Sequence, residues 1–263
     1  ISMLLTITSG LNLTAYADSS QYGNIYYEEK EDGTIEITGC TSSATSINIP
    51  STIVGKTVTS IRNCAFYGCK SLTSVTIPNS ITSIGREAFY DCTSLTSISI
   101  PHSVTSIDNY AFYGTSLINL SIPASVASIG EGAFNGCKSL ANVTIGNNDS
   151  AEKRSTEIGN SAFSECTSLS SVTIGNNVTS IGAAAFSDCS SLTSVTIPNS
   201  VTSIEYGTFS YCENLTSVTI PNSVTSIGDE VFYRCSSLKN ITIPDSVTSI
   251  GDHAFFECKL VTL

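Results

Sequence analysis

Hydrophobic and polar positions recur along this chain with a period of about 23 residues. A phenylalanine marks the same point of every unit, and successive phenylalanines lie 22 or 23 residues apart, with one interval of 29. The nine positions are Phe66, Phe89, Phe112, Phe134, Phe163, Phe186, Phe209, Phe232 and Phe255. Nine copies of one unit therefore fill residues 40–263, with the last copy incomplete. Repeats of this length are typical of solenoids, in which each unit packs only against its neighbours.

The clearest unit runs from Pro221 to Ile243 and reads PNSVTSIGDEVFYRCSSLKNITI. In the LTSVTIP stretch, apolar and polar residues alternate, which predicts one short parallel β-strand per unit on the concave side of the solenoid. The SVTSI stretch predicts a second, briefer extended segment. In G-x-x-A-F-x-x-C, the positions of Ala185, Phe186 and Cys189 fall near one helical face, which predicts a short 3₁₀ or α-helical turn. A single unit buries too few apolar side chains to offset the entropy of ordering it, so we expect the units to stack.

Two short segments precede the repeats. Residues 1–17 end in the small-residue pattern Ala15-Tyr16-Ala17, which is typical of the rear of a secretory signal peptide. An ordinary N-terminal strand or tail is the alternative. Residues 18–39, which contain the stretch GTIEITG, lie between this pattern and the first repeat.

Two units carry insertions directly after the strand, one between Pro50 and Ile61 and the other at residues 147–157. A place that accepts extra residues twice is a surface loop. The second insertion gathers several charged residues in a chain that has few, so it is either a recognition loop or a solvated excursion.

The charge balance argues against several classes of partner. Charged residues make up only 13% of the chain and the net charge is −11, whereas nucleic acids and anionic membranes select clusters of Lys and Arg. No run of 18 apolar residues is present, so we expect no membrane-spanning segment. The two histidines, His102 and His253, are about six repeats apart, and the chain shows no catalytic triad, phosphate loop or calcium loop. We therefore expect no catalytic residues, no cofactor and no metal site.

Eight of the ten cysteines occupy one column of the repeat, namely Cys69, Cys92, Cys137, Cys166, Cys189, Cys212, Cys235 and Cys258. Neighbours in such a column lie about 5 Å apart and point the same way, whereas a disulfide or a zinc site needs converging side chains. Eight equivalent thiols are not active sites either. We expect small buried hydrophobes beside the phenylalanine column. Cys40 and Cys64 lie outside the column, and whether these two pair is left open.

The outward positions of the predicted strands form two polar columns, which are the candidate binding face. Its residues are Ser74, Thr76, Ser97, Ser99, Asn119, Ser121, Asn142, Thr144, Ser171, Thr173, Ser194, Thr196, Ser217, Thr219, Asn240 and Thr242. Such a uniform face can bind a protein or a glycan weakly at each point and gain from repetition. A purely structural role is the alternative, because threonine favours strands and cross-strand pairs stabilise them.

A second candidate is an aromatic ridge formed by Tyr67, Tyr90 and Tyr113, which occupy one slot beside the core phenylalanine. Tyrosine offers apolar area with a polar tip, so a stacked row of rings can serve as a binding surface. The alternative is that these rings only shield the coils beneath them.

The unit resembles the BspA-like leucine-rich repeat, the 23-residue class found in surface proteins of host-associated anaerobes and some parasitic protists. The columns I-P and V-T-S-I-G-x-x-A-F-x-x-C-x-S-L carry the resemblance over about residues 40–263. It implies a leucine-rich-repeat solenoid in an exported, non-enzymatic adhesion or binding protein. The stretch GTIEITG looks like the short β entry cap that such proteins often have, so the resemblance also implies an N-terminal β cap at residues 18–39. Members of the family have been linked to host matrix proteins and to bacterial co-aggregation, and the family has no catalytic residues.

The expected function is therefore a secreted or cell-surface module that binds a protein of the host matrix, a host receptor or another bacterium. The main alternative is a structural spacer that holds another domain away from the cell envelope. Binding of an ice or crystal surface through the Ser-x-Thr columns is a third reading. The chain stops at ECKLVTL without a recognisable cap, so end-to-end association through this end is a further expectation.

Overall fold

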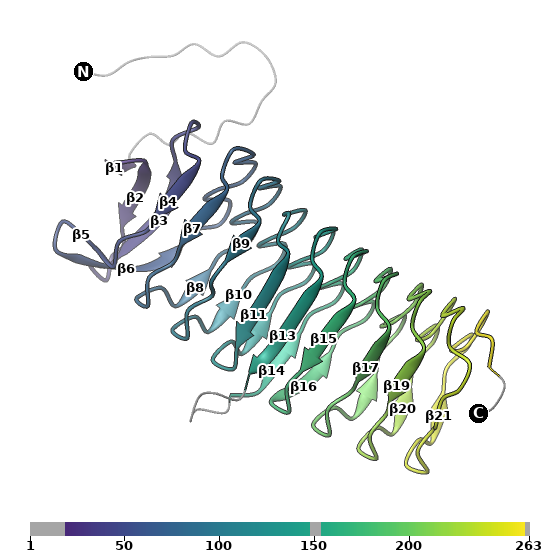
Figure 1. Ribbon diagram of the computed structural model, residues 1–263. Coiled ribbons are helices and arrows are strands. Elements are labelled where there is room, and N and C mark those ends of the chain that lie inside the picture. The colour runs from purple at the N-terminus through teal and green to yellow at the C-terminus, as the bar shows by residue number, and fades with distance from the viewer. Residues whose placement is uncertain (1–18, 148–153, 261–263) are drawn as a thin grey trace, which may run out of the picture.

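The computed structural model describes residues 19–147 and 154–260 of the chain. The expected signal-peptide remnant at residues 1–17, the middle of the insertion at 147–157 and the end of the last repeat lie outside the described residues. The described chain winds into an elongated β-solenoid of about nine turns, with its two ends at opposite ends of the rod (Figure 1). The repeat period therefore predicted the architecture.

The stretch that corresponds to LTSVTI forms a strand in eight successive coils on one side of the rod, which we call the strand face. Neighbouring strands pair in parallel with partners one unit apart, as Val195 pairs with Val218. Val195 and Ile197 are buried while Ser194 and Thr196 are exposed, as the alternation predicts. The strands are β4 (Ser46–Asn48), β7 (Ser74–Thr76), β9 (Ser97–Ile98), β11 (Asn119–Pro123), β13 (Asn142–Asn147), β15 (Ser171–Ile174), β17 (Ser194–Thr196) and β19 (Ser217–Thr219).

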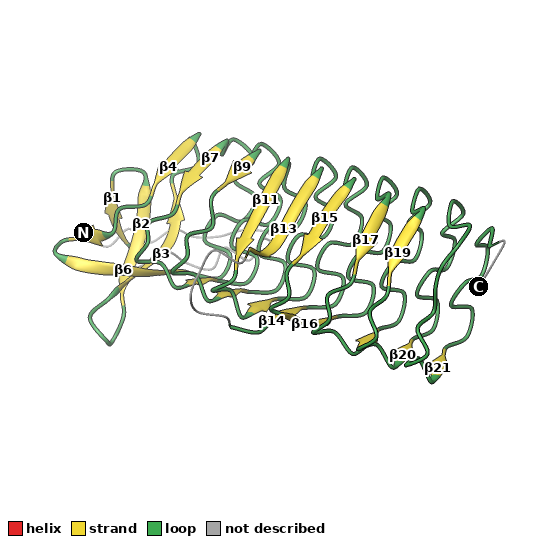
Figure 2. Ribbon diagram, turned by 60° about the horizontal axis from the view of Figure 1, so that its bottom comes forward, coloured by secondary structure: helices red, strands yellow, loops and turns green. Residues whose placement is uncertain are grey.

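The SVTSI stretch forms a second parallel ladder, and Figure 2 shows the two ladders as separate rows along the rod. From β6 to β20 each of these strands buries an isoleucine, such as Ile204, which is 2% exposed, whereas Ile250 on the last strand is 50% exposed. The strands are β6 (Lys56–Ile61), β8 (Ser83–Ile84), β10 (Ser106–Ile107), β12 (Ser128–Ile129), β14 (Thr156–Ile158), β16 (Val178–Ile181), β18 (Ser203–Ile204), β20 (Ser226–Ile227) and β21 (Ser249–Ile250).

The third side of each coil, G-x-x-A-F-x-x-C, contains no helix within the described residues, so the predicted 3₁₀ or α-helical turn is wrong. A helix does not form because alternate backbone amides point toward the next coil. In one coil, the amides of Glu87, Phe89 and Asp91 donate to carbonyl oxygens of the next coil at 2.7 to 3.0 Å. The amides between them close tight turns within their own coil, as Ala88 donates to Gly85 at 3.2 Å. A helix would need every amide to donate within its own segment, and alternate amides here do not.

Two backbone positions in each coil adopt the left-handed conformation, and they flank the core phenylalanine. Their φ angles lie between 52° and 70°, and only five of these residues are glycine. The first column is Cys64, Glu87, Tyr110, Gly132, Ser161, Ala184, Gly207, Glu230 and His253, and the second is Gly68, Asp91, Gly114, Gly136, Glu165, Asp188, Tyr211, Arg234 and Glu257. A residue with a side chain costs about 1 to 2 kcal/mol in this conformation. The hydrogen bonds between coils hold these residues there.

The core is a stack of side chains in register. The nine core phenylalanines form one continuous pile from Phe66 to Phe255, with successive ring centroids 4.9 to 5.8 Å apart and ring planes within 16° of parallel. Offset stacking of this kind is a favoured aromatic arrangement. Because each ring packs mainly on its neighbours in the pile, no coil has a complete core of its own.

The N-terminal cap covers one end of this pile. β1 (Ser20–Tyr22), β2 (Ile25–Glu29) and β3 (Ile35–Cys40) pair antiparallel, and β3 then pairs in parallel with β6. Arg62 on β6's coil donates through Nη1 to Glu28 at 2.8 Å and through Nε to Glu36 at 2.7 Å. The hydrogen bonds from Arg62 lower the pKa of Glu28, so this ion pair joins the cap to the first coil.

The insertion between Pro50 and Ile61 forms a β-hairpin rather than an irregular loop. β5 (Thr52–Ile53) pairs antiparallel with the start of β6 across a two-residue turn. Both turn residues have positive φ, 49° at Val54 and 75° at Gly55, as a type I′ turn requires. The hairpin projects from the side of the rod near the cap (Figure 1).

The left-handed columns predict an unusual response to glycine. Ala184→Gly should raise the free energy of unfolding by about 0.5 to 1 kcal/mol, because it removes the strain of a left-handed alanine. Its neighbour Ala183 does not have positive φ, so Ala183→Gly should lower the free energy by a similar amount. Urea unfolding followed by far-ultraviolet circular dichroism measures both changes. Equal destabilisation by the two substitutions would contradict this account of the turn segment.

Candidate functional site

The structure places the predicted binding residues on the strand face. Fifteen of the sixteen are exposed, and Thr144 is half-buried. Fourteen lie in or directly beside a strand of this face, whereas Asn240 and Thr242 follow β19 in a coil that forms no regular strand. The face therefore exists as an array of hydroxyl and amide groups, and its role in binding stays a prediction.

The strand face is divided into three sheets. β4, β7 and β9 form the first, β11, β13 and β15 the second, and β17 and β19 the third. The break between β9 and β11 coincides with an irregularity of the repeat: Leu117 comes five positions after Phe112, whereas Leu95 comes six positions after Phe89.

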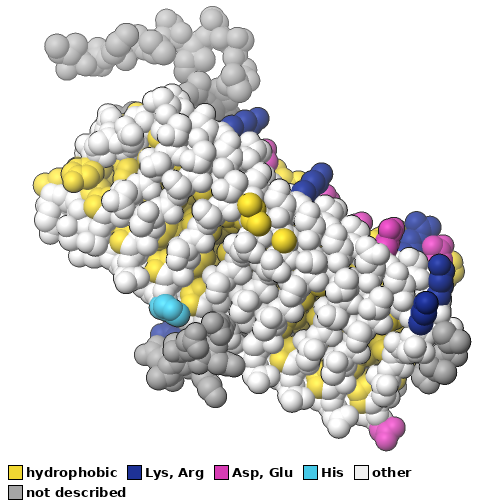
Figure 3. Space-filling view, in the orientation of Figure 1, with side chains coloured by type: hydrophobic (Ala, Val, Ile, Leu, Met, Phe, Trp, Pro, Cys, Tyr) yellow, Lys and Arg dark blue, Asp and Glu magenta, His cyan; other side chains and the backbone are white. Residues whose placement is uncertain are grey.

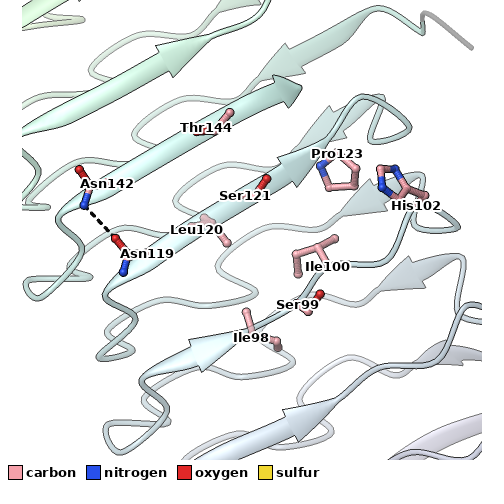
Figure 4. A pocket seen from close by; sticks show the side chains of 10 residues that line it. All are labelled: Ile98, Ser99, Ile100, His102, Asn119, Leu120, Ser121, Pro123, Asn142 and Thr144. Carbon is pink, nitrogen blue, oxygen red and sulfur yellow. Dashed lines mark hydrogen bonds between the residues drawn. The ribbon is translucent and has the colours of Figure 1, made fainter. Parts of the chain in front are cut away.

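A hollow opens at this break, and we call it the front hollow (Figure 4). It has a volume of about 520 Å³ and is lined by Ile98, Ser99, Ile100, His102, Asn119, Leu120, Ser121, Pro123, Asn142 and Thr144. Its floor is apolar, because Ile98 is only half-buried where the equivalent Val75 and Val195 are buried. Figure 3 shows apolar side chains visible between rows of polar ones on the strand face.

The polar wall of the front hollow comes from the predicted binding face. Five of those residues line it, namely Ser99, Asn119, Ser121, Asn142 and Thr144. The Nδ2 atom of Asn142 donates to Oδ1 of Asn119 at 2.8 Å, which fixes the orientation of both amides. His102 and Pro123 lie next to each other at one end (Figure 4). None of the lining residues is Asp, Glu, Lys or Arg, so recognition here would use hydrogen bonds and apolar contact.

Sequence reasoning missed the front hollow. The alternation predicts that the apolar strand positions point inward, which holds for Ile100 and Leu120 but only in part for Ile98, and His102 was considered only in relation to catalysis. The one signal that could have found the hollow is the coil that is a residue short, because a change of coil length disturbs the register of the adjacent strands.

A second hollow, of about 590 Å³, lies where the strand face loses its regular strands beyond β19. Its lining includes Ser217, Asn240 and Thr242 from the predicted face, with Ile241 and Ile243 beneath them. Both hollows therefore occur where the strand ladder is interrupted, and both combine apolar floors with neutral polar walls.

The predicted aromatic ridge is a stack of rings. Tyr67 and Tyr90 lie 4.9 Å apart with planes 6° from parallel, and Tyr90 and Tyr113 lie 4.5 Å apart at 9°. Since the rings cover one another's faces, the ridge presents ring edges along its length and an open face only at its ends. Tyr67, at one end, is 53% exposed. This geometry favours packing between coils, and a binding role for the ridge stays a prediction.

The cysteine column consists of free thiols, as predicted. Each thiol from Cys92 to Cys258 donates to the carbonyl oxygen of the core phenylalanine one coil earlier, at 3.0 to 3.3 Å. Thr115 takes the place of cysteine in the short coil and donates to Phe112 at 3.0 Å. Burial raises the pKa of Cys92 to about 12 and that of Cys137 to about 11, so these thiols stay protonated.

The two cysteines outside the column do not face each other. The sulfur of Cys40 lies 3.5 Å from that of Cys69, the first member of the column. The exposed thiol of Cys64 instead donates to Glu87 at 3.5 Å. A pairing of Cys40 with Cys64 is therefore wrong for this structure.

The described part of the chain contains no cluster of three or more His, Cys, Asp or Glu side chains that could hold a metal ion. Residues 19–147 and 154–260 also include no helix with the length and apolarity needed to cross a bilayer.

The repeats can now be compared with known proteins. A family model described as the BspA type leucine rich repeat region, in six copies, matches residues 38–156 and 156–263. The chain belongs to this family. Among solved structures, this BspA-type chain is similar to a leucine rich repeat protein of T. pallidum, at 29% identity over 92% of this chain and 90% of that one, with a TM-score of 0.57.

Another similar structure is a leucine rich cell surface protein of Faecalibacterium prausnitzii, at 26% identity over 93% of the BspA-type chain and 94% of that one, with a TM-score of 0.46. A search of curated proteins found no match.

Burial of the thiol column predicts the order in which cysteines react. With iodoacetamide under native conditions, Cys64 should be alkylated readily because it is exposed, whereas Cys166 and Cys189 should react only after urea unfolds the solenoid. Mass spectrometry at successive times, with peptide fragmentation to locate the modified cysteine, measures each rate. Alkylation of Cys166 in the native protein as fast as that of Cys64 would show that the column is open to solvent.

Proposed function

We propose that the protein is an exported, non-catalytic adhesion module whose strand face binds a protein on a cell or host surface. The observation that carries this proposal is the front hollow, which interrupts an otherwise uniform face with an apolar floor and neutral polar walls. Interfaces owe most of their affinity to a few well-packed points, and uniform Ser and Thr columns offer none. The front hollow supplies such a point.

Two observations support an exported location. Residues 1–17 end in a small-residue pattern typical of a cleavable secretory signal. The chain also belongs to the BspA type family, whose resemblance led us to expect surface proteins. A location at the cell surface would place the strand face where it can reach host or bacterial proteins.

The chemistry of the face indicates the kind of partner. Its outward residues are Ser, Thr and Asn, and the hollow adds isoleucine and leucine side chains. Such a surface fits uncharged polar and apolar side chains of a protein segment that lies along or across the coils. Each contact is weak, so many copies displayed on one cell would bind through avidity.

Binding to immobilised host matrix proteins and to whole bacteria, measured by biolayer interferometry, tests the proposal. Ser121→Arg places a bulky charge in the front hollow and should weaken binding at least about tenfold. The matched control is Ser180→Arg, since Ser180 is equally exposed but lies on β16 of the second ladder. The affinity of this control variant for the partner should equal that of the wild type.

Three outcomes would count against the proposal. Equal losses from Ser121→Arg and Ser180→Arg would remove the strand face as the site, and a loss from Tyr90→Ser alone would move the site to the aromatic ridge. Absence of binding even with the protein displayed in many copies on beads would favour the structural spacer.

The neutral lining predicts weak dependence on salt. Because no charged side chain lines the front hollow, the Kd should change by less than about threefold between 0.05 and 0.5 M NaCl. Titrations with the same partner at both salt concentrations measure this. A fall in affinity of more than about tenfold at the higher salt concentration would show that charged groups elsewhere on the chain carry the binding.

A further inference from the structure

The N-terminal end of the cysteine column differs from the rest of it. Each later thiol donates to a phenylalanine carbonyl of the coil before it, as Cys92 does to Phe66. Cys69 belongs to the first coil, so no earlier core phenylalanine is available to it. The cap supplies Cys40 instead, at the last position of β3, and the two sulfurs lie 3.5 Å apart. At this end of the column, the thiols of Cys40 and Cys69 therefore contact each other, where later thiols contact a phenylalanine carbonyl.

We propose that Cys40 and Cys69 are a disulfide-forming site, at which a small-molecule disulfide oxidises the pair and joins the cap covalently to the first coil. The site lies where two separately built parts of the fold meet, because Cys40 belongs to the antiparallel cap and Cys69 to the solenoid. Among the described cysteines, this is the pair whose sulfurs approach each other directly.

Solvent can reach this pair. Both side chains are only half-buried, unlike the interior members of the column. They line a cavity of about 650 Å³ together with Tyr26, Tyr67 and Lys70. A disulfide needs the sulfurs to approach to about 2.05 Å, a movement of roughly 1.5 Å that side-chain rotation can supply at half-buried positions.

The two thiols have different roles in the exchange. The hydrogen bond from Cys40 lowers the pKa of Cys69, and the same contact raises the pKa of Cys40. Cys69 is therefore the attacking thiolate, and Cys40 is the thiol that holds its proton until the second step.

The reaction balances without any further reagent. The Cys69 thiolate attacks a sulfur of the disulfide RSSR, which forms Cys69–S–S–R and releases RS⁻. This thiolate takes the proton of Cys40, and the resulting Cys40 thiolate attacks the Cys69 sulfur and expels the second RS⁻. Two protein thiols are oxidised to one disulfide, and RSSR is reduced to two thiols.

The third thiol in the same cavity provides an internal comparison. Cys64 also lines it, but its thiol donates to Glu87 at 3.5 Å and faces away from the pair. The pKa of Cys64 is raised, first by burial and then by the charge of Glu87, so it is a poorer nucleophile than Cys69. We therefore expect Cys64 to be dispensable for the disulfide.

The cross-link closes a loop between residues that are 29 positions apart. By restricting the unfolded chain and holding the cap on the first coil, it should raise the Tm of the oxidised protein by roughly 5 to 10 °C over the reduced protein.

The test is to incubate the full chain with oxidised glutathione, block remaining thiols with N-ethylmaleimide, and map peptides by mass spectrometry without reduction. We expect a linked peptide containing Cys40 and Cys69, and the same link at the same rate in Cys64→Ala. Cys40→Ala should instead retain glutathione on Cys69. If Cys40→Ala fails to fold, the Cys64→Ala result and the Tm shift of the oxidised wild type still decide the matter.

Three results would overturn the proposal. One is a linked peptide that joins Cys64 to either of the other two cysteines. Another is glutathione that stays on Cys69 of the wild type with no internal link. The third is an oxidised protein whose Tm equals that of the reduced protein.

Discussion

The hydrogen bonds that each turn segment donates to the next coil are the constraint on which the rest of the structure depends. The amides of residues such as Glu87, Phe89 and Asp91 point along the rod, so their partners lie one repeat away. This requirement holds two residues per coil in the left-handed conformation and prevents a helix. It also stacks the phenylalanine rings and places each column cysteine from Cys92 to Cys258 against a carbonyl oxygen of the coil before it. One set of backbone contacts thus explains the strain, the core and the inert thiols.

Interruptions of the repeat, rather than the repeat itself, give the molecule its distinctive sites. The front hollow lies beside the short coil after Phe112, where β9 and β11 belong to different sheets. The start of the solenoid leaves Cys69 without a phenylalanine carbonyl and sets it against Cys40. A perfectly regular array would present identical groups at every coil and would discriminate poorly among partners. If the proposed binding function holds, specificity would depend on the few coils that depart from the consensus.

The period, the inward positions and the free thiols could be predicted from the sequence, because stacking makes each position experience the same surroundings in every coil. The turn segment was predicted wrongly because Ala185, Phe186 and Cys189 have helical spacing, and spacing does not tell whether an amide bonds within its coil or to the next. The partner of Cys40 could not be predicted, because it depends on how the cap hairpin is aligned with the first coil. Predicting the front hollow would have required knowing how a single missing residue affects the register of the strands.

The same hydrogen bonds have a mechanical consequence. Neighbouring coils rise by about the 5 Å that separates stacked rings, whereas a released coil of about 23 residues can extend to roughly 75 Å. Tension along the axis would act on the contacts between successive coils in series. Each coil that is released would lengthen about fifteenfold while the remaining coils stay wound. A rod of this construction would yield stepwise when pulled along its axis and would dissipate energy at each step.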